Sequence, residues 1–290
     1  MNGISRRSVL IATAALPAAV AATRGDAKSI PTFRTLKYEA QGPICVITLN
    51  RPENDNLIDD ENRHELAAAW DAFRSDDELH VAIFTATGDT VFCGGADLAG
   101  LRNSSTSAYV RRDEGIRTFT SKQNKCWKPV IAAINGYVAG PGLHFLLDAD
   151  ICISVPDATF CDIHMHRTGA VPIIEPIEMA RKIPHEAVSR MFLLGPNEPI
   201  SAQRALDLGL ISEIVPGDRL MQRANELARQ ICQADIRLTT AFVESLYKAR
   251  ELGVTEAINR GLIIRQATGY QDAPFKNRPI GELVKPGGTK

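Results

Sequence analysis

Two histidines, His164 and His166, are separated by one residue and follow Asp162 in the stretch CDIHMHRTG. Imidazole has a pKa of about 6.5, so it can take and return a proton at neutral pH. A neighbouring carboxylate can fix the tautomer of the ring and support its charged form. In an extended chain, residues two apart face the same side, so all three side chains could reach one pocket. This pattern favours an acid/base site.

Two other interpretations of this stretch stay open. Asp162, His164 and His166, together with Cys161, could bind zinc, although a His-x-His pair alone is a weak signal for a metal site. The stretch could also be a solvated loop without a chemical role. We predict an acid/base site, with no metal and no cofactor.

Buried strands and helices alternate over the first part of the chain, as the apolar runs show. Continuous apolar runs are typical of strands covered on both faces, as in parallel sheets; they occupy residues 43–50, 81–87, 128–136 and 149–155. Residues 59–75 carry apolar side chains at helical spacing. This order predicts an α/β fold with parallel strands. Amphipathic helical segments then follow at residues 184–195, 201–210, 218–233, 236–251 and 254–269.

The composition excludes one class of partner. The chain has 290 residues, of which 44% are hydrophobic and 23% charged, and its formal net charge is −1. These values suit a globular protein. Because there is no basic excess, we expect no attraction for nucleic acid.

Residues 1–27 have the pattern of a leader that is not part of the fold. Arg6 and Arg7 precede the apolar run IATAALPAAVAA, which is too short for a comfortable membrane span. The paired arginines resemble a twin-arginine signal, although the usual later lysine is missing. We expect export of the folded protein to the periplasm, without membrane attachment after processing. If the signal is not used, the protein stays cytoplasmic.

The resemblance to a known family is carried by an ordered set of segments, residues 47–53, 92–98, 128–154, 158–160 and 200–216. Together they resemble the crotonase superfamily of enoyl-CoA hydratases and isomerases. This resemblance implies an α/β fold, with a ββα spiral core over residues 30–215 and a C-terminal helical segment over residues 216–275. The tail, residues 276–290, is rich in Pro, Gly and Lys and is expected to be loosely ordered. The family's usual assembly implies a homotrimer or hexamer.

The resemblance also assigns backbone groups to an oxyanion site. The family stabilises an enolate-like oxyanion with two N–H groups. The first falls on Ala96, in a turn whose glycines let the backbone approach a carbonyl closely. The second falls on Pro141, which has no N–H, so we expect Gly142 or a side chain to replace it. The expected substrate contacts around the two turns are Gly95, Asp97, Leu98, Gly140 and Pro141.

The acid/base residues depart from the family's pattern. Hydratases carry one glutamate at the position of His144 and a second at or beside His164, in a loop that is one residue longer here. Neither position holds a carboxylate in this chain. His144 could instead replace the missing oxyanion donor. The predicted catalytic residues are His144, His164, His166, Asp162 and Glu175.

The longer loop resembles one branch of the superfamily, the 6-oxocamphor hydrolase-like enzymes that hydrolyse carbon–carbon bonds of β-diketones. The matching residues are Phe160, Asp162, His164, His166, Thr168, Gly169, Val171 and Pro172. An aspartate of that branch is not matched, because Ile174 stands at its position and Glu175 follows.

We therefore expect an enzyme, and the leading prediction is retro-Claisen hydrolysis of a small β-diketone-type carbonyl compound. A histidine would activate the water that attacks one ketone, while the enolate leaves from the other. Export supports this prediction, because CoA thioesters are cytoplasmic metabolites. Two alternatives stay open: a hydratase or isomerase acting on an acyl-CoA, and an inactive crotonase fold that serves in binding.

Overall fold

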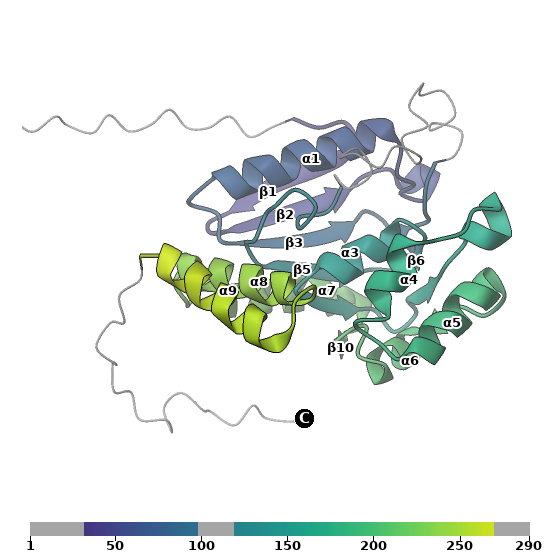
Figure 1. Cartoon of the computed structure of the whole chain (residues 1–290). Coiled ribbons are helices and arrows are strands. Elements are labelled where there is room, and N and C mark those ends of the chain that lie inside the picture. The colour runs from purple at the N-terminus through teal and green to yellow at the C-terminus, as the bar shows by residue number, and fades with distance from the viewer. Residues whose placement is uncertain (1–31, 98–118, 270–290) are drawn as a thin grey trace, which may run out of the picture. The chain divides into compact units, whose positions relative to one another are not determined.

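Two sheets form the core of the protein, and the chain alternates between them (Figure 1). The computed structural model describes residues 32–97 and 119–269. Pairs of consecutive strands are divided between the sheets, so that β3 and β4, β5 and β6, and β7 and β8 each place one strand in either sheet. This alternation is the ββα spiral that the resemblance to the crotonase superfamily implied.

The larger sheet has six strands in the order β1-β2-β3-β5-β7-β10. β1 is antiparallel to β2, and all other neighbours are parallel. Every residue of β2, β3 and β5 is buried, which explains their continuous apolar sequences. The strands span Leu36–Gln41 (β1), Ile44–Leu49 (β2), Val81–Ala86 (β3), Val130–Ile134 (β5), Ile151–Ser154 (β7) and Glu213–Ile214 (β10).

The smaller sheet has four short strands in the order β4-β6-β8-β9. β4, β6 and β8 are parallel, and β9 is antiparallel to β8. The two glycine-rich turns follow β4 and β6 directly, and the histidine stretch follows β8. Parallel strands end at the same edge of a sheet, so this sheet brings the three candidate segments together. The strands span Val91–Cys93 (β4), Tyr137–Ala139 (β6), Thr159–Cys161 (β8) and Ile200–Ser201 (β9).

Aromatic side chains join the two sheets to helices α1 (Asp60–Ser75) and α3 (Gly142–Asp148). The ring of Phe84 in β3 lies 5.7 Å from Trp70, 5.9 Å from Phe92 and 4.4 Å from Phe145, measured between centroids. These residues come from α1, β4 and α3, and all are buried. Helix α3 is therefore anchored in the core, and its seven residues are all buried.

Helices dominate the part of the chain that follows β8. A π-helix, η2, begins it, and α4 packs on α3 (Figure 1). Ser201 caps α6, because its hydroxyl accepts a hydrogen bond from the Arg204 N–H at 3.2 Å. The elements are η2 (His164–Thr168), α4 (Ile174–Met179), α5 (His185–Leu194), η3 (Gly195–Asn197), α6 (Ala202–Asp207), α7 (Leu220–Ile231), α8 (Ile236–Ala249) and α9 (Val254–Ala267); short 3₁₀ turns, η1 and η4, span Pro52–Asn54 and Gly217–Arg219.

The C-terminal helices differ in what they cover. Helix α7 packs on β2, β3, β5 and β7, whereas α8 and α9 pack mainly on each other. This pair exposes apolar side chains, namely Phe242, Leu246, Val254, Ile258, Leu262 and Ile263. Within residues 32–97 and 119–269, no helix combines the length and the hydropathy that a membrane span needs.

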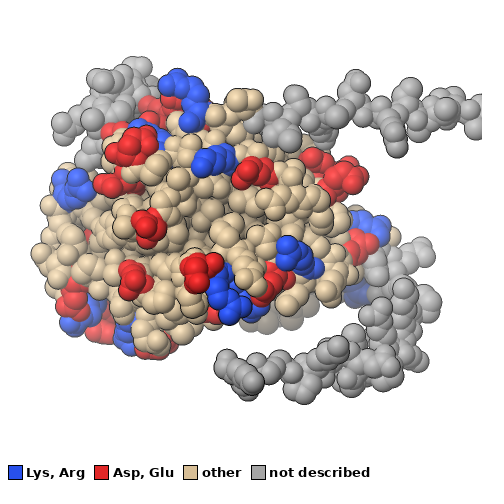
Figure 2. All heavy atoms as spheres, turned by 180° about the vertical axis from the view of Figure 1, so that it is seen from behind, with Lys and Arg blue, Asp and Glu red and all other residues tan. Residues whose placement is uncertain are grey.

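Charged side chains of both signs are interspersed on the face of the molecule shown in Figure 2. Neither sign forms a continuous stripe over the described residues on that face.

Candidate active site

The first glycine-rich turn holds the Ala96 N–H in a fixed direction. Ala96 forms a parallel bridge with Ile58, in which the Ile58 N–H donates to the Gly95 carbonyl and the Asp97 N–H donates to the Ile58 carbonyl, both at 2.9 Å. In such a bridge the central residue's own N–H points away from its partner. The Ala96 N–H is thus directed away from Ile58. Gly95 has a φ of 122°, which a residue with a side chain rarely adopts.

The second turn starts helix α3 and supplies a second N–H. Pro141 has helical dihedral angles and contributes no donor, so Gly142 carries the first N–H of the helix. The next two N–H groups, of Leu143 and His144, donate to the carbonyls of Gly140 and Pro141. The first N–H groups of a helix have no partner inside it, so the Gly142 N–H has no acceptor within α3.

The two turns lie against each other and against one histidine. A Cβ atom on Gly140 would lie 3.7 Å from the Gly95 Cα and 3.7 Å from the His164 Cε1. The Gly140 backbone therefore lies between the first turn and the ring of His164. These are ordinary contact distances, and it is the φ of 48° that favours glycine at position 140.

His144 is held from two sides by carboxylates of α4. Its Nε2 lies 3.0 Å from Oε1 of Glu175, and its Nδ1 lies 3.9 Å from Oε2 of Glu178. The His144 side chain is 6% exposed and that of Glu175 is 8% exposed. The buried Nδ1 has no hydrogen-bond partner among the described residues. Nε2 is therefore the ring nitrogen that a carboxylate, that of Glu175, engages directly.

His164 forms a second pair, with Asp162. Its Nδ1 lies 2.7 Å from Oδ2 of Asp162, and its backbone N–H donates to Oδ1 of the same carboxylate at 3.0 Å. Asp162 is completely buried. The other ring nitrogen of His164, Nε2, lies 3.8 Å from Oε1 of Glu175. Glu175 thus connects the two histidines through one oxygen atom.

The protonation of the cluster follows from these contacts. Burial lowers the pKa of His144, but the hydrogen bond to Glu175 and the charges of Glu175, Glu178 and Asp148 outweigh it and raise the pKa above its ordinary value. Burial likewise lowers the pKa of His164, and the Asp162 hydrogen bond with the nearby Glu175 charge raises it overall. For Glu175, burial raises the pKa, but the two histidines lower it overall. These shifts favour imidazolium rings beside an ionised carboxylate.

The structure does not bring His166 into this cluster. Residues 164–168 form a π-helix rather than an extended chain, so residues two apart no longer face the same side. The His166 Nε2 instead lies 3.0 Å from the Leu193 carbonyl oxygen, at the end of α5. A Cβ atom on Gly195 would lie 2.5 Å from the His166 Cδ2, so this ring is packed on the turn after α5.

Glu178 is the acidic neighbour of His144 that we did not predict. Glu175 and Glu178 are three residues apart on one helix, a spacing that places side chains on the same face. Once Glu175 was a candidate, this spacing could have identified Glu178 from the sequence.

Two of the predicted substrate contacts, Asp97 and Leu98, follow the first glycine-rich turn. The Asp97 carboxylate lies 3.4 Å from Nη2 of Arg51 and accepts a hydrogen bond from the Asn54 side chain at 3.2 Å. Leu98 lies outside the described residues. In the described part of the chain, no three His, Cys, Asp or Glu side chains are arranged to hold a metal ion.

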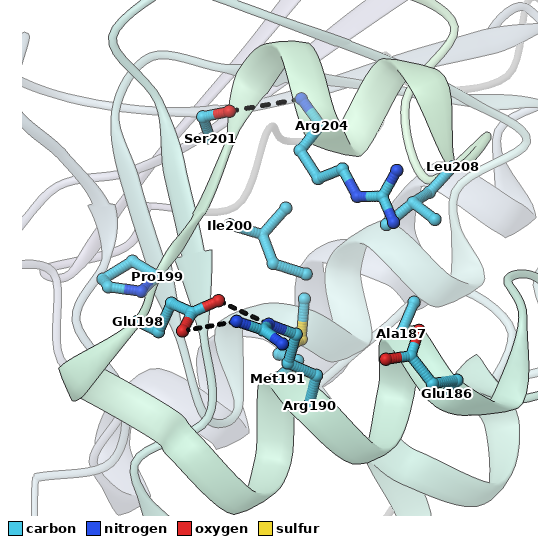
Figure 3. Close-up of a pocket in the computed structure, with 10 residues that line it drawn as sticks. All are labelled: Glu186, Ala187, Arg190, Met191, Glu198, Pro199, Ile200, Ser201, Arg204 and Leu208. Carbon is cyan, nitrogen blue, oxygen red and sulfur yellow. Dashed lines mark hydrogen bonds and ion pairs between the residues drawn. The ribbon is translucent and has the colours of Figure 1, made fainter.

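A separate surface pocket lies between α5, β9 and α6 (Figure 3). Arg190 and Glu198 form a bidentate ion pair at one side of it, and the Arg204 side chain extends over Leu208 at the other. None of its lining residues is a predicted site residue. This pocket takes no part in the histidine cluster.

Known proteins agree with the fold. The enoyl-CoA hydratase/isomerase family matches residues 39–271. The (E)-benzylidenesuccinyl-CoA hydratase of Thauera aromatica is 31% identical over 228 residues, which are 78% of this chain and 85% of that protein. The carnitinyl-CoA dehydratase of Proteus mirabilis is 33% identical over 225 residues, 77% of this chain and 84% of that protein.

A solved structure shows the same architecture. The crystal structure of an enoyl-CoA hydratase/isomerase from Mycobacterium paratuberculosis superposes with a TM-score of 0.74 at 33% identity, covering 83% of this chain and 92% of that one. Alternating strands in two sheets, followed by a helical C-terminal part, define the crotonase fold. The chain belongs to the enoyl-CoA hydratase/isomerase family.

The prediction of β-diketone hydrolysis is wrong. The similar proteins are named as a hydratase and a dehydratase of CoA compounds, which favours the acyl-CoA alternative. The prediction rested on the absence of a carboxylate at two positions of the sequence, on the longer loop with its histidines and on the expected export. Helix α4 brings Glu175 and Glu178 to His144 in space, so carboxylates are present although those positions lack them.

Proposed function

We propose that the protein adds water to, or removes water from, the α,β-carbons of an acyl-CoA thioester, with His144 as a general acid/base. One observation carries this proposal. The position that holds a glutamate in hydratases holds His144, whose Nε2 is fixed by Glu175 at 3.0 Å while its buried Nδ1 has no hydrogen-bond partner among the described residues. A ring held in this way has one nitrogen ready for proton transfer.

The two turns supply the donors that stabilise the negative charge developing on the substrate in this reaction. Addition of water at Cβ moves electrons toward the thioester carbonyl, whose oxygen becomes an enolate oxyanion. The N–H groups of Ala96 and Gly142 lie in adjacent turns, and preorganised donors of this kind stabilise an oxyanion strongly. Gly142 takes the part that Pro141 cannot take.

Asp162 and His164 act on this reaction through Glu175. Asp162 fixes Nδ1 of His164 at 2.7 Å, which leaves Nε2 facing the Glu175 carboxylate at 3.8 Å. A positive His164 in this position keeps Glu175 ionised. An ionised Glu175 in turn supports the imidazolium form of His144.

The substrate class is tested directly with the purified enzyme. A panel of 2-enoyl-CoA and 3-hydroxyacyl-CoA thioesters, including carnitinyl-CoA and benzylidenesuccinyl-CoA, is incubated with the protein and followed by the absorbance of the conjugated thioester. We expect turnover of at least one pair in both directions. A folded protein that turns over none of these thioesters would overturn the proposal.

Export is a separate proposal, supported by Arg6 and Arg7 in the leader of residues 1–27. Cell fractionation should find a shortened periplasmic protein, and a double change to lysine, Arg6→Lys with Arg7→Lys, should keep it full-length and cytoplasmic. A wild-type protein that stays unprocessed would overturn export and leave the acyl-CoA proposal unaffected.

Assembly into a homotrimer or hexamer is proposed as well. The apolar side chains that α8 and α9 expose, among them Phe242 and Ile258, support it, because monomers rarely expose such surfaces. Sedimentation of the purified protein should give a mass of three or six chains, and a monomer at micromolar concentration would contradict this.

A further inference from the structure

The side chain of Ile163 lies in a notch that two glycines leave open, one in each glycine-rich turn. A Cβ atom on Gly95 would lie 2.8 Å from the Ile163 Cδ1, and a Cβ atom on Gly140 would lie 3.5 Å from the Ile163 Cγ1. The first distance is shorter than two carbon atoms tolerate, so the isoleucine methyl group occupies the place that a side chain at position 95 would need. Ile163 is 7% exposed, and it lies against both turns.

Ile163 packs apart from the main core of the protein. It forms a small cluster with Ala139 and Cys161, the last residues of β6 and β8, and Tyr137 of β6 packs against this cluster. The Tyr137 hydroxyl and the Cys161 thiol lie 3.0 Å apart and join the same two strands. Ile163 is thus held by the strand ends that lead into the second turn and into the histidine stretch.

The shape of isoleucine suits this place. The side chain branches at Cβ, which leaves it few rotamers. Its Cγ1 faces the second turn and its Cδ1, one bond further out, faces the first turn. A Cβ atom on Gly140 would also lie only 3.7 Å from the Gly95 Cα, so the turns are close enough for one stiff side chain to reach both.

We propose that Ile163 is a positioning residue that sets the separation of the two oxyanion donors, the N–H groups of Ala96 and Gly142. Ala96 directly follows Gly95 in the first turn. Gly142 begins α3 two residues after Gly140, so a shift of either notch glycine moves a donor. Donors stabilise an oxyanion strongly only where they are already in place before the charge develops. This inference rests on the proposed function, because the oxyanion is the enolate of that reaction.

Two variants remove the side chain in steps. Ile163→Val deletes Cδ1 and keeps the contact at Gly140, whereas Ile163→Ala deletes both contacts. We expect kcat for hydration of a 2-enoyl-CoA to fall by about threefold to tenfold in the first variant and by about 10-fold to 100-fold in the second. The affinity for the enolate of a 3-oxoacyl-CoA, followed by its near-ultraviolet absorbance, should fall by a similar factor, because this enolate presents an oxyanion to the same donors.

The pH profile separates this role from an effect on the acid/base groups. A change at Ile163 leaves every charged group beside His144 in the chain, so the alkaline limb of kcat against pH should not move. Glu175→Gln removes one of these charges and should move the limb. Glu186→Gln, at an exposed position of α5, should leave it in place.

Ile211→Val is the matched control, because Ile211 is 3% exposed, belongs to the main core and loses the same methyl group. It should leave kcat and the enolate affinity unchanged. A folded Ile163→Ala enzyme with kcat within about twofold of the wild type would overturn the role of Ile163. A lower kcat with unchanged enolate affinity, or with a moved alkaline limb, would overturn it too. If Ile163→Ala does not fold, Ile163→Val decides by the same criteria.

Enolate binding needs no hydration, so it distinguishes this inference from the function on which it rests. A wild type that hydrates no thioester would overturn the proposed function. An enolate that binds the wild type and the Ile163 variants equally, or binds none of them, would overturn the role of Ile163.

Discussion

The carboxylate of Glu175 lies 3.0 Å from Nε2 of His144, and both side chains are more than nine-tenths buried. An ion pair in such a place is retained only where its geometry compensates the loss of water around two charges. Here the pair fixes which ring nitrogen of His144 is engaged, Nε2, and leaves Nδ1 without a hydrogen-bond partner among the described residues.

Replacement of Glu175 by glutamine should move the pH dependence of the enzyme. The Glu175 hydrogen bond and charge raise the pKa of His144, so Glu175→Gln should lower that pKa. Because the imidazolium is the acid, the alkaline limb of kcat against pH should shift to lower pH. The measurement is a pH profile of hydration, with Glu186→Gln as the control. An unmoved limb would show that Glu175 does not set the pKa of His144.

Asp162→Asn should slow the reaction without unfolding the protein. Asparagine keeps an oxygen for the backbone N–H of His164, but its amide cannot support a charged ring as the carboxylate at 2.7 Å does. We expect kcat to fall by about tenfold or more, with KM little changed. Steady-state kinetics and a thermal melt check this. Wild-type kcat in a folded Asp162→Asn protein would remove His164 from the mechanism.

His166→Ala should have only a small effect on catalysis. His166 bonds the Leu193 carbonyl on an exposed surface, and one such hydrogen bond is worth about 0.5–1.5 kcal/mol. The change should therefore lower the free energy of unfolding by about that amount, which His166→Gln should partly recover because it keeps a donor, and kcat should stay close to the wild-type value. A loss as large as that from a change at His144 would mean that His166 belongs to the site after all.

Gly142→Ala should damage the packing of the second turn. An added Cβ would lie 3.0 Å from the Cβ of Cys93 and 3.0 Å from the Cγ1 of Val138, both buried. Overpacking of this kind costs about 1–3 kcal/mol, and displacement of the N–H should also lower kcat. Gly217→Ala is the control, because its Cβ would meet Val155 at an ordinary 3.7 Å. Denaturant melts should separate the two variants, and equal stability would contradict the close packing.

The strands and turns were predictable from the sequence because their physical signals are local. The apolar runs that became β2, β3 and β5 are continuous, as full burial demands. The glycines at positions 95 and 140 have positive φ angles that few other residues adopt. The pairing of His164 with Asp162 was also within reach, since the two are neighbours in the chain.

The arrangement of the histidines was less predictable, for two reasons. The π-helix over residues 164–168 overturned the expectation that His164 and His166 share a side, and its single-turn geometry leaves no periodic pattern to detect. The approach of Glu175 and Glu178 to His144 depends on the packing of α4 on α3, a tertiary contact that no spacing within one element specifies. Without that contact, the sequence showed no carboxylate beside His144, which was one of the reasons for choosing the wrong reaction.

The most direct test of the central claim is kcat for hydration of a 2-enoyl-CoA by His144→Gln, measured beside the wild type. Glutamine keeps a polar side chain of moderate size but cannot transfer a proton. We predict that kcat falls by about 10²-fold to 10⁴-fold, while KM and the melting temperature change little. A folded His144→Gln enzyme that retains more than about a tenth of the wild-type kcat would contradict the assignment of His144 as the acid/base of this enzyme.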